Sequence, residues 1–174
     1  MKRYPDLSRD ERIGKVMGER RTDLALVLEN LNEELNIAAI LRSAEGFGVG
    51  LVCIIYSGKK PRVNVDSASG ASKWLNIKFY KSTKACLNTL KKQGFQLYGA
   101  LVDPDSEPIW KQDLTGKVAV VMGNEVNGLS KIAQKLVDKN LYIPMFGLTE
   151  SFNVSVSAGI FLYEVARQIR QLAD

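Results

Sequence analysis

Histidine is absent from this sequence of 174 residues, and cysteine occurs only twice, as Cys53 and Cys86. Without histidine, the chain has no histidine general base, no serine–histidine pair and no histidine-ligated metal. The two cysteines stand in unrelated sequence contexts and form no CxxC motif, so neither a zinc cluster nor a disulfide framework is predicted. We expect two reduced, packed thiols and no bound metal.

Long hydrophobic runs are absent as well. The longest, VAVVM at 118–122 and AGIFLY at 158–163, fall far short of the ~20 residues that cross a bilayer. The first residues, MKRYPDLSRDERIGK, are charged and lack the apolar stretch of a signal peptide. With 45% hydrophobic and 25% charged residues, residues 1–174 are expected to form one globular domain of a cytoplasmic protein that binds no membrane.

Positive charge is distributed unevenly along the chain. The net charge is +5, but residues 57–93 alone carry nine lysines and arginines against a single acid. Residues 1–22 carry seven basic and four acidic residues, so the remainder of the chain is acidic on balance. Such segregation is typical of a protein that binds a polyanion, with nucleic acid the first candidate. The alternative is a solvated surface that happens to be rich in lysine.

Apolar runs and turn signals predict alternating strands and helices. Strands are expected at 24–30, 51–56, 77–80, 95–102, 118–123 and 141–145. Helices are expected at 8–20, 36–47, 82–93 and 153–172, with a further one starting near Ser130. The first helix is basic and begins with Ser8 and Glu11 in capping-box positions. Residues 58–74 are expected to be a loop with one short helical turn, and DPDSEP at 103–108 a turn. The near-continuous apolar strands favour an α/β fold with a mostly parallel sheet flanked by helices.

Two glycine-rich segments have different contexts. EGFGVG at 45–50 closes a helix and enters a strand, which is the wrong context for a dinucleotide-binding motif and indicates a helix C-cap turn. MGNEVNGLS at 122–130 follows a buried strand and opens a helix. It is therefore either a ligand-binding loop at the carboxyl end of a strand or a plain strand-to-helix connection.

Three blocks in fixed order decide between these alternatives. NIAAILRSAEGFGV at 36–49, VMGNEVNGLS at 121–130 and IPMFGLTESFNVSVSAGI at 143–160 together resemble the three signature motifs of the SPOUT methyltransferases. They are most similar to the SpoU (TrmH) branch of RNA ribose 2′-O-methyltransferases. The resemblance implies a deep C-terminal trefoil knot, S-adenosylmethionine bound within it, and a homodimer with active sites at its interface.

The resemblance also implies site residues. The catalytic set would be Asn36, Arg42, Glu125, Ser151 and Asn153. The cofactor would be held by Ala100, Leu101, Gly123, Asn124, Glu125, Ile143, Met145, Phe152 and Asn153. Phe152 departs from the leucine usual in the family, and it is either a reshaped pocket wall or simple core packing. Asn153 could also serve as the N-cap of the last helix.

The resemblance assigns Arg42 as the catalytic residue, often described as a general base. A guanidinium group is a poor base because it stays protonated. We therefore interpret Arg42 as a clamp on an RNA phosphate that orients the ribose 2′-OH and stabilises developing negative charge. The structural alternative is a surface salt bridge from Arg42 to Glu45 or Glu125.

The basic segments supply candidate RNA contacts. These are Arg9, Arg12, Lys15, Arg20 and Arg21 near the N-terminus, with Lys59, Lys60 and Arg62 after the second strand. The expected function is methylation of a ribose 2′-OH in RNA, at a D-loop guanosine of tRNA. The alternatives are another tRNA position or ribosomal RNA, and, more distantly, a non-catalytic RNA-binding protein. A dinucleotide-dependent enzyme is disfavoured because the chain lacks the glycine motif in the required context.

Overall fold

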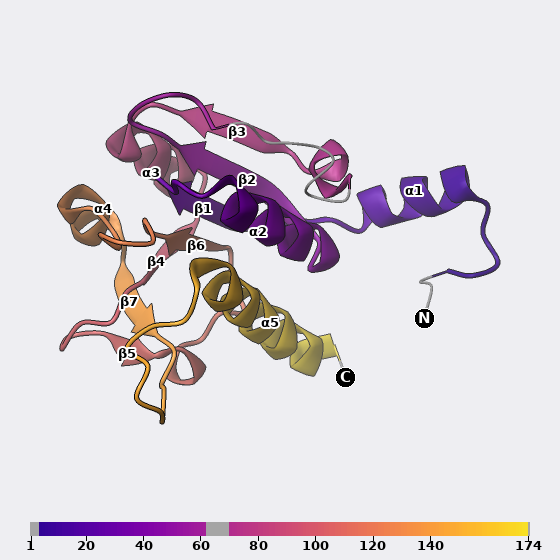
Figure 1. Ribbon diagram of the computed structural model, residues 1–174. Helices are drawn as coiled ribbons and strands as arrows, with labels where there is room; N and C mark the ends of the chain where they lie inside the picture. Colours follow the sequence, from indigo (N-terminus) through magenta and orange to yellow (C-terminus); the bar gives the residue numbers. More distant parts are fainter. Residues whose placement is uncertain (1–3, 62–69, 174) are drawn as a thin grey trace.

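The structure is a computed structural model and describes residues 4–61 and 70–173. In these two ranges, seven strands form one sheet in the order β3-β2-β1-β6-β4-β7-β5, and every pair of neighbours is parallel (Figure 1). The strands are β1 (Arg21–Glu29), β2 (Val49–Ile55), β3 (Ile77–Tyr80), β4 (Gln96–Ala100), β5 (Glu107–Pro108), β6 (Val118–Met122) and β7 (Lys139–Tyr142). The predicted α/β fold with a parallel sheet is thus confirmed.

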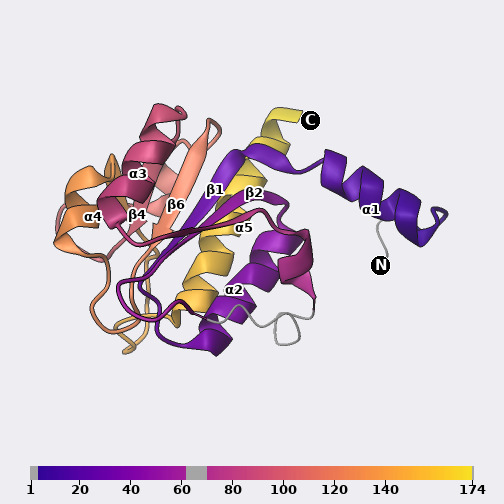
Figure 2. The ribbon, with the colours of Figure 1, turned by 90° about the horizontal axis from the view of Figure 1, so that it is seen from above.

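Five α-helices accompany the sheet within the described residues. They are α1 (Arg9–Gly18), α2 (Glu34–Gly46), α3 (Thr83–Lys92), α4 (Lys131–Leu136) and α5 (Val154–Ala173), with short 3-10 helices η1 (Ala71–Trp74) and η2 (Ile109–Lys111). Figure 2 shows α2 and α5 on one face of the sheet and α3 and α4 on the other. The parallel strands are therefore buried on both faces, as their unbroken apolar sequences require.

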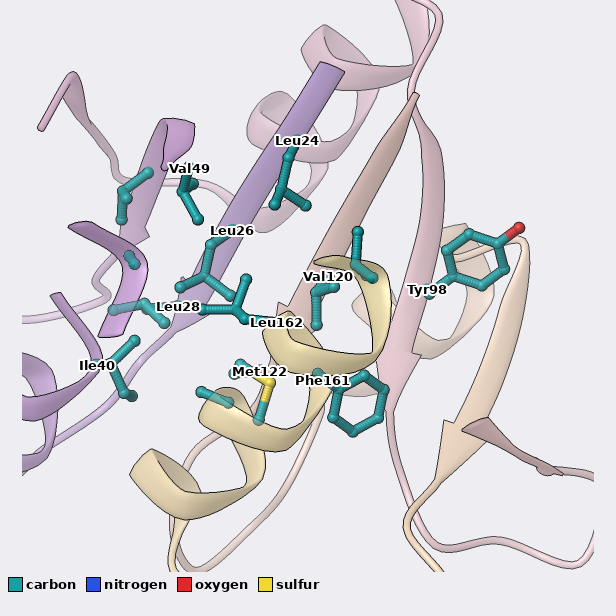
Figure 3. Packing of buried hydrophobic residues seen from close by; sticks show 14 of the residues in the cluster. Leu24, Leu26, Leu28, Ile40, Val49, Tyr98, Val120, Met122, Phe161 and Leu162 are labelled. Carbon is teal, nitrogen blue, oxygen red and sulfur yellow. The ribbon is translucent and has the colours of Figure 1, made fainter. Parts of the chain in front are cut away.

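The central strand β1 shows how the sequence divides between the two faces. Leu24, Leu26 and Leu28 alternate toward α2 and α5, where they meet Phe161 and Leu162 of α5 (Figure 3). Ala25 and Val27 point to the opposite face and join the cluster beneath α3 and α4. All five β1 residues are fully buried, so β1 anchors both hydrophobic layers.

Local signals fix the beginnings and ends of several helices. The Ser8 side chain accepts from the Glu11 amide and the Glu11 carboxylate accepts from the Ser8 amide, forming the predicted capping box of α1. Ser82 and Ser130 cap α3 and α4 in the simpler way. Gly48 follows α2 with φ of 68°, as the C-cap interpretation of EGFGVG predicts. Helix α1 itself buries no residue and projects from the sheet (Figures 1 and 2).

The structure corrects two expectations and adds to a third. DPDSEP contains more than a turn, because residues 107–108 extend the sheet as β5, paired with β7. The last strand covers 139–142, not 141–145, since Pro144 has no amide for the ladder and the chain turns there toward a cavity. The two cysteines, in unrelated contexts in the sequence, meet between β2 and α3. Both are free and buried, as predicted, and their mutual hydrogen bond and burial raise the pKa of Cys86.

Within the described ranges, no helix is long and apolar enough to span a membrane. Residues 4–61 and 70–173 likewise contain no cluster of acidic residues and cysteines that could hold a metal ion.

Candidate active site

A cavity of about 580 Å³ opens at the carboxyl edge of the sheet, beyond the ends of β4, β6 and β7. Its walls come from residues 100–102, 122–126, 141–143, 145 and 150–154, with Glu33 and Asn36 of the β1–α2 region and Ser157 and Phe161 of α5 among the remaining contributors. Parallel sheets place ligand sites at this edge because all strands end there. The volume lies within the roughly 300–1,000 Å³ typical of small-molecule sites.

The turn after β6 forms one wall. Asn124 and Gly128 exchange both backbone hydrogen bonds, at 3.0 and 2.9 Å, and Gly128 adopts φ of 62°. A Cβ atom at Gly123 would collide with the Gly128 carbonyl group, so only glycine permits this closure. The Asn124 side chain accepts from the amides of Val126 and Asn127 and donates to the Asn30 carbonyl at 2.7 Å. MGNEVNGLS is therefore a rigid loop tied to the end of β1.

Glu125 ties the same loop to the start of α2. Its carboxylate accepts from the backbone amides of Asn32 and Glu33 at 3.1 and 3.2 Å, and from the Asn36 side chain at 3.1 Å. Burial alone would raise the pKa of Glu125, but the hydrogen bonds from Asn32, Asn36 and Glu33 outweigh it and lower that pKa. The carboxylate thus acts as an acceptor for amides that would otherwise lack a partner at the entrance to α2.

Asn36 joins the three sequence blocks. It donates to Glu125 of the second block and accepts from the Asn153 side chain of the third block at 3.1 Å. Asn153 in turn accepts from the Ser155 amide at 2.8 Å, so it is also the predicted N-cap of α5. Residues from three distant parts of the chain therefore form one hydrogen-bonded chain at the cavity wall.

A second carboxylate, Glu29, holds the other end of the loop. It is only 1% exposed. Glu29 accepts from the Thr83 hydroxyl at 2.5 Å, from the Ser130 amide at 2.9 Å and from the Ser130 hydroxyl at 2.7 Å. The last residue of β1 therefore fixes the starts of both α3 and α4, and with them the end of the 123–130 loop.

The cavity has an acidic and apolar character. Glu33, Glu125 and Glu150 line it, whereas no lysine or arginine does so within the described ranges. Leu101, Met122, Ile143 and Phe161 add apolar surface. Such a lining favours a ligand with an apolar body and a positive charge over a phosphorylated one.

Most of the predicted site residues line this cavity. They are Asn36, Ala100, Leu101, Gly123, Asn124, Glu125, Ile143, Met145, Ser151, Phe152 and Asn153. Arg42 is not among them: it is exposed on α2, six residues or about 9 Å of helix beyond Asn36. Phe152 is 42% exposed, which favours the pocket-wall interpretation over core packing.

Sequence reasoning missed several lining residues. Ser157 and Phe161 follow Asn153 at intervals of four, so helical spacing from the N-cap was the signal for both. Glu150, next to the predicted Ser151, and Val102, after β4, also line the cavity. Outside the cavity, sequence reasoning also missed the structural role of Glu29, which it treated only as part of an apolar strand.

The candidate RNA contacts are unequally available. Arg20 bonds the Val49 carbonyl and lies 3.7 Å from Glu45, and its side chain is only 8% exposed. Arg21 forms a two-point contact with Asp23, and Arg12 donates to the Leu7 carbonyl. Arg9, Lys15, Lys59 and Lys60 are exposed. Arg62 lies outside the described residues.

The fold and site define a parallel α/β protein whose ligand cavity lies beside a topological switch point. The chain leaves β1 through α2 on one face and leaves the neighbouring β6 through α4 on the other. Comparison with known proteins identifies the family: the chain belongs to the SpoU rRNA methylase family, whose model matches residues 23–163.

Relatives of known name agree with this membership. The chain is 34% identical over 159 residues to a tRNA (guanosine(18)-2′-O)-methyltransferase of Aquifex aeolicus, covering 91% of this chain and 75% of that protein. It is 36% identical over 151 residues to a 23S rRNA (guanosine-2′-O-)-methyltransferase, RlmB, of Acinetobacter baylyi, covering 83% of this chain and 60% of the relative. The crystal structure of the A. aeolicus TrmH/SpoU tRNA modifying enzyme superposes with a TM-score of 0.87 and 31% identity, covering 94% of this chain and 85% of that one.

Proposed function

We propose that this protein methylates the ribose 2′-OH of a D-loop guanosine in tRNA, with S-adenosylmethionine as the methyl donor. Family membership and the named tRNA (guanosine(18)-2′-O)-methyltransferase relative support the reaction and the substrate. The observation that carries the proposal is the hydrogen-bonded chain Glu125–Asn36–Asn153, which unites the three motif blocks at one cavity.

The residues of the cavity fit the proposed cofactor. S-adenosylmethionine supplies an activated methyl group on a positively charged sulfonium. The three carboxylates of the lining attract positive charge, and the apolar residues from the ends of β4, β6 and β7 offer a wall for an adenine ring. We assign adenosine binding to residues 100–101, 123–124, 143 and 145, and the polar end of the cofactor to Ser151, Phe152 and Asn153.

The remaining groups position the RNA. Glu125 fixes the Asn36 side chain, and Asn36 in turn fixes the Asn153 side chain. We assign these two amides to the placement of the incoming ribose. Arg42 lies outside the cavity, on the exposed side of α2 where an RNA phosphate has access. In our proposal it clamps the phosphate beside the target ribose and stabilises the negative charge that develops on the 2′ oxygen. The hydroxyl proton passes to that phosphate or to water.

Methylation kinetics with Arg42 variants test this assignment. Arg42→Ala is expected to lower the rate of methyl transfer roughly 100-fold or more and to leave the affinity for S-adenosylhomocysteine unchanged in calorimetry. Arg42→Lys is expected to fail as well, because a point charge does not reproduce a two-point clamp. Near-normal turnover by Arg42→Ala would remove the role from Arg42.

A second candidate substrate is ribosomal RNA. The 36% identity to a 23S rRNA methyltransferase favours it, although that match covers less of the relative. Mass spectrometry of ribose-methylated nucleosides from tRNA and ribosomal RNA of cells with and without the gene distinguishes the two. Loss of one 2′-O-methylguanosine from tRNA alone supports our first choice.

We further propose that residues 1–174 form a single cytoplasmic domain with a deep C-terminal trefoil knot. The support for the knot is the order of the elements: after β7 the chain passes the cavity and returns as α5, which packs against α2 on the far face from α4. Limited proteolysis tests this arrangement. At a protease concentration that cleaves α1, the 143–173 segment should remain uncut.

The exposed apolar residues around the site support a homodimer. Phe146 and Leu148 of the cavity loop are 96% and 105% exposed, and Val156 and Tyr163 of α5 and Leu35 of α2 are also exposed. Exposed apolar side chains on the cavity loop, α2 and α5 are the kind that a partner subunit would cover and a monomer would leave in water. Light scattering should give the mass of a dimer, and Tyr163→Glu should shift it toward the monomer.

Phosphate binding by the basic segments completes the proposal. Arg9, Lys15, Lys59 and Lys60 are exposed enough to meet phosphates, whereas Arg12, Arg20 and Arg21 are held by internal hydrogen bonds. Replacement of Arg9 and Lys15 by alanine therefore tests RNA binding without loosening α1. The salt dependence of binding should become shallower by roughly 0.7 to 0.9 in the log–log slope for each phosphate that is no longer neutralised.

A further inference from the structure

A second cavity, of about 490 Å³, lies at the same edge of the sheet beyond the ends of β1 and β2. Asn30 and Asn32 line it from one side, and Tyr56, Lys59 and Lys60 line it from the other. The segment between β1 and α2 separates it from the first cavity, since Glu33 and Asn36 face the first and Asn30 to Asn32 face the second. The proposed function so far uses only Lys59 and Lys60 of this lining, as phosphate contacts, and assigns no role to the cavity itself.

Asn30 carries an unused acceptor in this wall. Its backbone is fixed on both sides, because its amide donates to the Ile55 carbonyl at 2.9 Å and its carbonyl accepts from Asn124 at 2.7 Å. Its φ of 53° is unusual for a residue with a side chain. The Oδ1 atom is buried and has no hydrogen-bond partner within the described residues. A buried acceptor without a donor costs stability, so the site is better satisfied when a ligand supplies an N–H group.

Two aromatic rings and two lysines lie at the carboxyl ends of β2 and β3. The Tyr56 and Phe79 rings meet edge to face at 6.3 Å. Lys60 Nζ lies 3.7 Å from the centre of the Phe79 ring, and Lys81 Nζ lies 5.4 Å from that of Tyr56. Tyr56 and Lys81 directly follow β2 and β3, so they share the carboxyl edge with Asn30. Proteins that bind unpaired nucleotides commonly stack the bases on aromatic rings and contact the phosphates with lysines and arginines.

We propose that this second cavity binds one unpaired nucleotide of the substrate RNA that flanks the methylated nucleotide. Its base stacks on Tyr56 and donates an N–H to Asn30 Oδ1, and its phosphate meets Lys59 and Lys60. The two cavities then bind neighbouring parts of the reaction's components. The first, lined by three glutamates, holds the cationic methyl donor, and the second, lined by Lys59, Lys60 and a single glutamate, Glu34, holds the polyanion. This inference rests on the proposed function, since it takes the first cavity as the site of methyl transfer.

The test is steady-state methylation of a tRNA transcript by variants of the full chain. Asn30→Gly removes the acceptor and tolerates the left-handed backbone, Tyr56→Leu removes the ring, and Lys59→Ala with Lys60→Ala removes the charges. Each is expected to raise KM for RNA by roughly 5- to 100-fold. The value of kcat and the affinity for S-adenosylhomocysteine should not change, because the deleted interaction is equally strong in the ground and transition states.

Lys84→Ala with Lys92→Ala is the matched control. Both lysines are exposed on α3, at the two ends of a helix on the opposite side of the sheet from α2, and their loss removes the same charge. If KM rises equally for the control pair and the Lys59/Lys60 pair, the effect comes from the loss of positive charge anywhere on the protein. That result would overturn the proposal. Unchanged KM in all three cavity variants would overturn it as well.

Fluorescence provides a readout that a structural role would not move. With 2-aminopurine placed in turn at each nucleotide flanking the methylated guanosine, one position should be quenched on binding. That quenching should disappear in Tyr56→Leu and persist in the control pair. If the wild-type chain methylates the transcript but no position responds to Tyr56→Leu, the second cavity is not a nucleotide site. If the wild-type chain neither methylates RNA nor binds S-adenosylhomocysteine, the proposed function itself fails.

Discussion

Two carboxylates, Glu29 and Glu125, perform reciprocal tasks at neighbouring strands. Glu29 ends β1 and binds Ser130 at the start of the helix that follows β6, whereas Glu125 follows β6 and binds Asn32 and Glu33 at the start of the helix that follows β1. Glu29 is buried and has no share in the cavity, while Glu125 is half-buried and lines it. The comparison shows that a carboxylate accepting hydrogen bonds at a helix start can stabilise the fold, as Glu29 does, or position residues of the cavity, as Glu125 does.

The largest effect is expected from Glu29→Ala. The substitution leaves the Thr83 hydroxyl and the Ser130 amide and hydroxyl without their buried acceptor, which should lower the free energy of unfolding by about 3 kcal/mol. For a chain of this length, that corresponds to a fall in Tm of roughly 6 to 12 °C. Below the transition, affinity for S-adenosylhomocysteine should remain within a few-fold of normal. A Tm within one degree of the wild type would show that solvent replaces these bonds.

Glu125→Ala should give the opposite profile. It frees the Asn36 side chain and two amides at a partly exposed position, so the expected loss of stability is only about 1 kcal/mol. Because Asn36 and Asn153 then lose their fixed placement, methyl transfer should slow by roughly 10- to 100-fold. Single-turnover assays at saturating cofactor measure this rate. A rate loss for Glu29→Ala as large as that for Glu125→Ala would erase the distinction between the two carboxylates.

Ser130→Ala sharpens the comparison, since Ser130 is both the N-cap of α4 and the partner of Glu29. Its hydroxyl accepts from the Ala133 amide at 3.1 Å and donates to Glu29, so its removal should cost about 1 to 2 kcal/mol. Chemical denaturation measures this loss. In a double-mutant cycle, the double variant should lose less unfolding free energy than the two single variants lose in total. Strict additivity would contradict a direct coupling between Glu29 and Ser130.

The smallest effect concerns pH. The hydrogen bonds to Glu125 outweigh its burial and lower its pKa in the folded state, so its ionised form contributes stability above the pKa of the unfolded chain, ~4.3. That contribution is lost as the pH falls from this value through the lowered folded-state pKa. Glu125→Gln should therefore lose less stability than the wild type over this acidic window. Parallel stability curves for the two proteins would contradict the assignment.

Local signals predicted much of the fold, and long-range contacts explain the rest. The Ser8–Glu11 box, the glycine after α2 and the apolar runs of β1 and β6 lie within short windows, and the structure confirms them. The two-residue strand β5 has no periodicity of its own and exists only through β7. Eleven of the predicted site residues line one cavity because they belong to the motif blocks or follow strand ends.

Glu29 and the second cavity had no such signal. The partner of Glu29 lies 101 residues away in sequence, and a glutamate at the end of an apolar strand has no local mark. Asn30 and Tyr56 each follow a different strand, and only the parallel pairing of β1 with β2 brings them together. Arg42 illustrates the reverse case, because the motif points to it and the folded chain leaves it outside the cavity.

The central position of β1 has a consequence for how the protein is made. The hydrogen bonds that close the site join residues 92 and 101 positions apart, and β1 gains its neighbour β6 only once residues 118–122 exist. A nascent chain leaving the ribosome therefore displays one long edge of β1, flanked by leucines, until more than half of the polypeptide has been translated. Pairing over such separations is slow and leaves an unpaired strand available to other chains. Truncated chains that end before β6 are therefore expected to aggregate, because β1 keeps an unpaired edge in them.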